Sequence, residues 1–205
     1  MGIELGIRMA LTMSDVTTDR VLDWLDSEIA HQESYHDHKE RMAWTALAFY
    51  VPGVLLLTNA VASDLGSGGR VFGTLLLIIL VRAVAMFVNM QFEMRWHAAD
   101  LANAIRRARG EVTVGKTLSQ DDLETTEWTG GGWVLPRFVA AKAELSRTDR
   151  SKDAFHRALG HFLDGRWAKI DARMRTELAG YIILAITTIV VVVAIWLPEF
   201  RSNSQ

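Results

Sequence analysis

The 205-residue sequence contains no cysteine, which excludes disulfide bonds, thiolate metal ligands and cysteine nucleophiles together. It has only three prolines, so long stretches of the chain can form uninterrupted helices. It also lacks an excess of positive charge, because 22 Lys and Arg residues are balanced by 24 Asp and Glu residues. A nucleic-acid-binding protein would need a basic field, so nucleic acid is not an expected partner.

Three long apolar runs dominate the chain. The first two cover residues 43–62 and 71–92 and are separated by a short polar turn, and the third covers residues 179–197 and carries no charge. Each run is long enough to cross a bilayer core of about 30 Å as a helix. The turn is too short for a folded domain, so residues 43–92 are predicted to form a transmembrane hairpin.

The water-facing segments are also expected to be helical, because apolar residues recur there every three or four positions. We predict an all-α integral membrane protein with a transmembrane helical hairpin, a helical module at residues 93–178 and a third, C-terminal transmembrane helix. Residues 15–42 are predicted to form a juxtamembrane helix that leads into the hairpin. Residues 1–14 are predicted to be a disordered extension, and residues 198–205 a short tail.

Helix boundaries inside the module follow from local signals. Gly110 is predicted to end the helix that continues from the second span. Ser119 and Asp122 resemble a capping box and predict a short helix as far as about Glu127. From Lys152 the chain meets no proline before Pro198, and an apolar stripe begins at Phe155, so one uninterrupted helix is predicted to run into the membrane.

The distribution of Lys and Arg predicts the orientation. Residues 1–42 carry four of them and residues 93–178 carry fifteen, whereas the hairpin turn and the C-terminal tail carry one each. The positive-inside rule then places the N-terminus and residues 93–178 in the cytoplasm and the C-terminus outside.

Arg82 lies near the centre of the second span, where a charged residue costs about 2.5–3.5 kcal/mol on insertion scales. Thr74, Arg82 and Asn89 are predicted to form an intramembrane polar stripe that Glu93 continues. No Asp or Glu lies within any of the three spans to neutralise the guanidinium. This stripe should therefore face protein or water rather than lipid.

Pro52 and Gly53 are predicted to kink the first span, because Pro52 leaves the carbonyl of Ala48 without its helical donor.

Two interpretations of Arg82 remain open. In the structural one, the guanidinium donates to the Ala48 carbonyl and to the hydroxyl of Thr187 or Thr188. In the functional one, Arg82 side chains from several protomers line a pore that favours anions.

A second stripe lies before the third span and predicts self-association. Its members recur mostly at helical spacing: Phe155, Leu159, Phe162, Ile170 and Met174.

Two further patterns resemble binding motifs. His31, His36 and His38 suggest a metal site or a pH sensor, but a closed ligand set is missing and a solvated helix is the simpler interpretation. Residues 110–117 match the phosphate-loop pattern G-x-x-x-x-G-K-[ST], yet a charged helix precedes them and no strand ending in Asp follows. We therefore predict no metal, no cofactor and no catalytic residues, and an enzyme is disfavoured.

The layout of residues 15–110, a membrane hairpin whose helices extend into a helical cytosolic region, resembles the SLATT-type proteins. Those are small prokaryotic membrane proteins thought to act as pore-forming or membrane-perturbing effectors in conflict systems. The resemblance implies a self-assembling, channel-like effector in contact with the lipid bilayer of a bacterial inner (cytoplasmic) membrane. Since it rests on layout, no functional residue is carried over. The alternative is a non-conducting scaffold or accessory subunit that binds another membrane or cytoplasmic protein.

Overall fold

The computed structural model describes residues 18–62, 66–128, 133–146 and 152–202. The predicted extension at residues 1–14 and the last three residues of the predicted tail lie outside this range. The chain divides into two compact units. Unit 1 consists of Met1–Lys39 and Glu93–Asp149, and unit 2 consists of Glu40–Phe92 and Arg150–Gln205.

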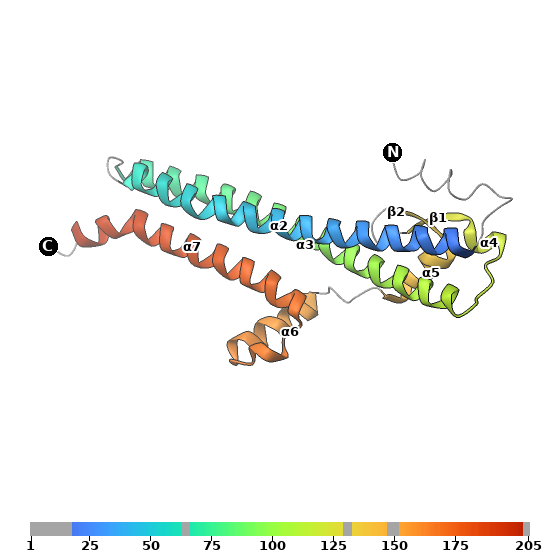
Figure 1. Cartoon of the computed structure of the whole chain (residues 1–205). Coiled ribbons are helices and arrows are strands. Elements are labelled where there is room, and N and C mark those ends of the chain that lie inside the picture. The colour runs from blue at the N-terminus through green and yellow to red at the C-terminus, as the bar shows by residue number, and fades with distance from the viewer. Residues whose placement is uncertain (1–17, 63–65, 129–132, 147–151, 203–205) are drawn as a thin grey trace. The chain divides into compact units, whose positions relative to one another are not determined.

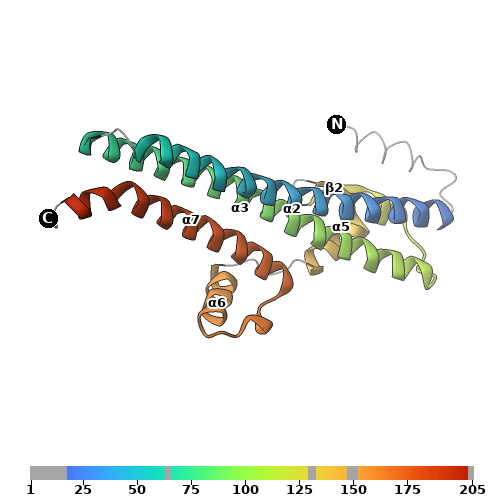
Figure 2. The same ribbon diagram turned by 60° about the vertical axis from the view of Figure 1, so that its left-hand side comes forward.

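Two long helices, α2 (Thr18–Ala62) and α3 (Ser67–Thr113), form a hairpin and contribute to both units. They lie side by side in both views (Figures 1 and 2). Each helix runs without interruption from its water-facing part into its apolar part, as the scarcity of proline predicts. Pro52 and Gly53 are exposed within α2, which continues past them to Ala62. The kink expected there stays a prediction.

Unit 1 packs a small sheet and a helix against the water-facing ends of α2 and α3. Strands β1 (Thr125–Trp128) and β2 (Trp133–Pro136) are antiparallel, with Thr125 opposite Pro136, and helix α5 (Arg137–Ser146) follows. The largest members of the buried core come from all of these elements: Leu25, Leu101, Ile105, Trp128, Leu135, Phe138 and Val139.

Two predicted helix ends in unit 1 are wrong. The capping box is confirmed, because the Ser119 hydroxyl accepts from the Asp122 amide, but helix α4 (Gln120–Leu123) stops well before Glu127. The β-branched pair that follows Glu124 favours a strand, and the chain enters β1. Gly110 does not end α3, which continues through Thr113.

Unit 2 contains the apolar parts of α2 and α3 together with helix α6 (Lys152–Leu163), the 3-10 helix η1 (Trp167–Lys169) and helix α7 (Ala172–Ser202). Its core joins α2, α3 and α7: Ala43, Leu47, Tyr50, Val54, Leu77, Val88, Phe92, Leu184, Val191 and Ile195. The backbone of α7 continues as a helix through the first residues of the predicted tail, as far as Ser202.

The uninterrupted helix predicted from Lys152 into the third span is wrong. Helix α6 ends at Leu163, and Gly165 adopts a left-handed φ of 71°. The Gly165 amide donates to the Phe162 carbonyl (3.0 Å) and the Arg166 amide to the His161 carbonyl (2.7 Å), the pattern of a Schellman motif. Glycine adopts this conformation without the cost that a Cβ would add.

Three described helices are long and apolar enough to cross a membrane: α2 between Thr18 and Thr58, α3 between Gly68 and Thr113, and α7 between Ala172 and Leu197. The chain is therefore a helical membrane protein. The predicted fold class is confirmed, with the two short strands as the departure from an all-helical fold.

Helix α7 packs closely against the hairpin at Gly180. A Cβ built on this residue would lie 3.3 Å from Leu47 Cδ1 of α2 and 3.4 Å from Phe92 Cε2 of α3. Both neighbours are buried and belong to the core of unit 2. The missing side chain lets three helices meet at one point, which is the usual role of small residues between membrane helices.

Replacing Gly180 with Val is expected to force α7 away from α2 and α3. The added side chain meets Leu47 and Phe92 at once, and overpacking of this kind costs about 1–3 kcal/mol. The thermal midpoint of the detergent-purified protein should fall. The matched control is Gly53→Val, where an added Cβ meets nothing within 4 Å. An equal loss in both variants would contradict a specific contact at Gly180.

Candidate functional site

Helix α7 is held to the hairpin by three hydrogen bonds inside the apolar part of unit 2. The pairs are Tyr181 Oη to Asn89 Oδ1 (3.0 Å), Tyr50 Oη to Thr188 Oγ1 (3.0 Å) and Trp196 Nε1 to Thr74 Oγ1 (3.2 Å). The α7 members are seven and eight residues apart, so they follow roughly one face of the helix. Each bond gives a polar-tipped side chain a partner on a neighbouring helix; the Tyr50 and Trp196 bonds are half-buried, and the Tyr181 bond is exposed near one end of the run.

The donors of these bonds follow from the remaining contacts. The Thr188 hydroxyl donates to the Leu184 carbonyl at 2.6 Å, so Tyr50 is the donor in its pair with Thr188. The Thr74 hydroxyl likewise donates to the Arg70 carbonyl at 2.9 Å and accepts from the Trp196 indole. Both threonine hydroxyl protons are therefore already used.

Arg82 is placed differently from the other two members of the predicted polar stripe. Thr74 and Asn89 bond to α7, whereas the Arg82 side chain is exposed. It forms no hydrogen bond or ion pair with any residue that the structure describes. The structural interpretation, in which Arg82 bonds to Ala48 and to the hydroxyls of residues 187–188, is not what the structure shows.

The position of Arg82 along α3 makes its exposure costly. Ten residues separate it from Phe92 and eleven from Val71, which is about 15 Å of helix in each direction. A side chain at this depth cannot bring its charge fully out to the headgroups by bending toward one end. Unit 2 therefore presents an intramembrane cation to whatever adjoins the outer face of α3.

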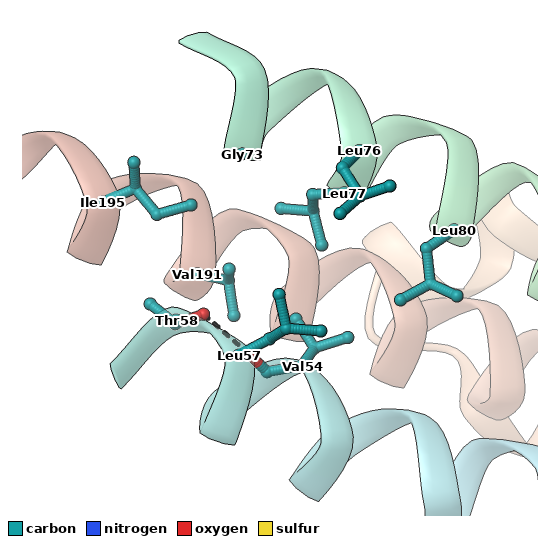
Figure 3. A pocket seen from close by; sticks show the side chains of 9 residues that line it. All are labelled: Val54, Leu57, Thr58, Gly73, Leu76, Leu77, Leu80, Val191 and Ile195. Atoms are coloured by element: carbon teal, nitrogen blue, oxygen red, sulfur yellow. Dashed lines mark hydrogen bonds between the residues drawn. The ribbon is translucent and has the colours of Figure 1, made fainter. Parts of the chain in front are cut away.

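One apolar pocket lies among α2, α3 and α7 (Figure 3). Its volume is about 30 Å³, close to the share of one water molecule in the liquid. Thr58 supplies the only hydroxyl among its lining side chains, and this hydroxyl donates to the Val54 carbonyl at 2.7 Å. The pocket is a small packing gap rather than a site for a ligand.

The stripe predicted for self-association lies in unit 2, and four of its five side chains are buried or half-buried there. Ile170 and Met174 are 3% and 5% exposed, and the Phe155 ring packs edge-on against Tyr181 at 5.7 Å. Leu159 is half-buried, and Phe162 is exposed. These side chains supply contacts inside the chain, so self-association through the whole stripe stays a prediction.

The three histidines of α2 do not converge. His31 and His38 are exposed, whereas His36 accepts at Nε2 from the Nε of buried Arg95 at 3.1 Å. The guanidinium thus lies against a nitrogen that a metal would need. Within the described ranges, no three His, Asp or Glu side chains are grouped as metal ligands.

Residues 110–117, which match the phosphate-loop pattern, form the end of a helix. Helix α3 runs through Thr113, and Gly115 follows with a φ of 97°. A phosphate-binding loop instead connects a buried strand to the start of a helix. The Lys116 amine lies 3.2 Å from Glu111 Oε2, so it faces a carboxylate of its own unit.

Glu111 is the centre of an ion-pair cluster in unit 1. It pairs with Lys142 of α5 and with Lys116 of the loop after α3. Hydrogen bonds from Lys142 and then from Lys116 lower the pKa of the Glu111 carboxyl below its ordinary value of about 4.5. The cluster fastens α5 and the loop to the end of α3.

The hairpin in unit 1 carries two further ion pairs. Arg109 of α3 donates through its Nη2 to Asp26 of α2 at 3.1 Å. Nearer the spans, Arg106 of α3 pairs with Glu33 of α2. Hydrogen bonding to Asp26 raises the pKa of Arg109. These pairs fix the register of the two helices outside the spans and leave their charges engaged within the chain.

The chain matches no family model, no curated protein and no solved structure. The residues that join α7 to the hairpin were not predicted from the sequence: Tyr50, Tyr181, Trp196 and Gly180. The sequence does contain a sign of them, because a polar-tipped aromatic residue or a glycine within an apolar run usually contacts a neighbouring helix.

Glu111→Gln is expected to lower the stability of unit 1 at neutral pH and to leave it unchanged in acid. The lowered pKa means that the folded chain favours the ionised carboxylate. Its stabilisation is present above about pH 4.5 and is lost as the pH falls through the folded-state pKa. Thermal unfolding along an acid titration should therefore show two curves that converge at low pH.

The matched control is Glu127→Gln. Glu127 is exposed, and no residue that the structure describes pairs with it. If this variant changes the acid dependence as much as Glu111→Gln does, the ion-pair cluster is not its cause.

Proposed function

We propose that this helical membrane protein self-assembles in a bacterial inner membrane and acts as a channel-like or membrane-perturbing effector, with Arg82 from several copies lining a polar path. The observation that supports the proposal most directly is the exposed Arg82 side chain in the middle of an apolar helix, without a partner in the described chain.

The surroundings of Arg82 limit how its charge can be accommodated. Nearby outward side chains on α3 are apolar, such as Ile78, Ile79 and Met86. The polar side chains of Thr74, Asn89 and Thr188 already bond to other helices. A second copy cannot neutralise the charge with a span carboxylate, because no span of this sequence contains Asp or Glu. Hydration of a shared, cation-lined path is one solution open to identical copies, and such a path favours anions.

The same residue supports one alternative. A different membrane protein could supply an intramembrane carboxylate to Arg82, and the chain would then be a non-conducting accessory subunit. Paired charges of this kind are a known way of placing ionisable groups within a bilayer. The resemblance of residues 15–110 to the SLATT-type layout supports the effector over the subunit.

The proposed orientation places unit 1 in the cytoplasm. It is supported by the excess of Lys and Arg in residues 93–178 over the hairpin turn and the tail.

Arg82→Leu and Arg82→Gln test the proposed path. Leu removes the charge and the donors and relieves about 2.5–3.5 kcal/mol of insertion cost, so the protein should insert normally. Gln keeps donors but removes the charge. Both variants should lose depolarisation of liposomes or induced cells, measured with a potential-sensitive dye, while crosslinking still detects oligomers.

The matched control is Met86→Leu, an exposed apolar position on the same helix. Depolarisation equal to wild type in both Arg82 variants would overturn the path. A wild-type protein that is monomeric, silent in the dye assay and copurifies with one membrane protein in an Arg82-dependent manner would establish the alternative.

Orientation is tested separately with a reporter that is active only in the cytoplasm. Fused after Asp122 it should be active, and fused after Gln205 it should be inactive, because the two sites flank one span. The reverse pattern would show that unit 1 faces outside.

A further inference from the structure

We propose that α6 and η1 form a membrane-surface anchor, which lies in the headgroup region of an anionic bilayer and inserts the side chains of Phe162, Leu163 and Trp167. The inference rests on the membrane-spanning character of α7 and is independent of the proposed polar path.

Helix α6 is amphipathic. Its apolar side chains lie on one face: Phe155, Ala158, Leu159, Phe162 and Leu163. The opposite face carries Arg157, Gly160, His161 and the following Asp164. A helix with one strongly apolar and one polar face lies along an interface between water and an apolar phase.

Only the first half of the apolar face is covered within unit 2. Phe155 packs against Tyr181 at 5.7 Å, and Ala158 is 4% exposed. At the other end Leu163 is 74% exposed. The centroids of the Phe162 and Trp167 rings lie 5.6 Å apart, and the two side chains remain 37% and 38% exposed. Together with Leu163 they form a compact apolar tip at the uncovered end.

The contact between Phe155 and Tyr181 places the first turn of α6 beside one end of the charge-free run of α7. Tyr181 lies at the beginning of the charge-free run of α7, where tyrosine is typical of the membrane–water boundary. From this point α6 projects to the side of α7 in both views (Figures 1 and 2). Helix η1 ends three residues before α7 begins, and the start of α7 lies about 14 Å of helix before Tyr181 on the water side.

The charges around the tip favour anionic lipid as its occupant. Residues 152–175 contain six Lys or Arg and three Asp. Arg166 and Lys169 lie on either side of Trp167 and are exposed, and Arg166 also lies 3.9 Å from the Asp164 carboxylate. Basic residues beside an apolar wedge are the pattern of helices that bind anionic membrane surfaces. A second copy of this surface would instead bring like charges together.

The absence of cysteine allows a direct test on the full-length protein. Leu163→Cys carries an environment-sensitive fluorophore in vesicles that contain phosphatidylglycerol and a lipid with a nitroxide near the headgroup. The matched control is Leu145→Cys on α5 of unit 1, which is 73% exposed. The probe at position 163 should show a blue-shifted emission and several-fold stronger quenching by the nitroxide lipid than the probe at position 145.

A second comparison tests the charges. In vesicles of phosphatidylcholine alone, or after Arg166→Gln and Lys169→Gln together, quenching of the probe at position 163 should weaken. Quenching that is unaffected by either change would overturn the assignment to anionic lipid. Equal quenching at positions 163 and 145 would overturn the anchor itself. A blue-shifted probe that the nitroxide lipid does not quench would assign the tip to a protein contact and overturn the proposal.

Discussion

The close approach at Gly180 is the contact on which the three-helix arrangement of unit 2 depends. Lipid tails are as apolar as leucine, so burial alone gives membrane helices little reason to associate. Gly180 lets α7 meet both Leu47 and Phe92, and the resulting van der Waals contact needs no hydrophobic driving force. Three interhelical hydrogen bonds add direction, each contributing about 0.6 kcal/mol and at most about 1.7 kcal/mol. Tyr50, Tyr181 and Trp196 therefore fix which face of α7 adjoins the hairpin.

Much of the fold could be predicted because the bilayer imposes a simple rule on the chain. Backbone groups within lipid must bond to one another, so an apolar run of sufficient length has to be a helix. The water-facing part obeys no such rule, and there the predictions failed at single residues. Gly165 lies within the helix that was predicted to be uninterrupted, but its left-handed φ ends that helix. The strand at Thr125–Trp128 depends on tertiary partners such as the buried ring of Trp128, which local sequence does not reveal.

The candidate site was predictable in its residues and not in their partners. A charge in the middle of an apolar run is conspicuous in any sequence, and so are the polar groups of Thr74 and Asn89. Which of them meets α7 depends on the rotation of α3 about its axis, and tertiary packing determines that rotation. Packing turned Thr74 and Asn89 toward aromatic donors of α7 and left Arg82 on the outer face. Thr188, expected beside Arg82, bonds to Tyr50 instead.

Tyr181 has a consequence for how unit 2 responds to the lipid around it. Its ring supports Phe155 of α6, while its hydroxyl donates to Asn89 of α3. One side chain thus joins a surface helix to the interior of the bundle. In the proposed position of α6 at the membrane surface, lateral pressure in the headgroup layer would act on this helix, and the Tyr181 ring is one of the contacts through which α6 meets α7 and α3. The proposal therefore links the composition of the surrounding lipid to the packing of the spans.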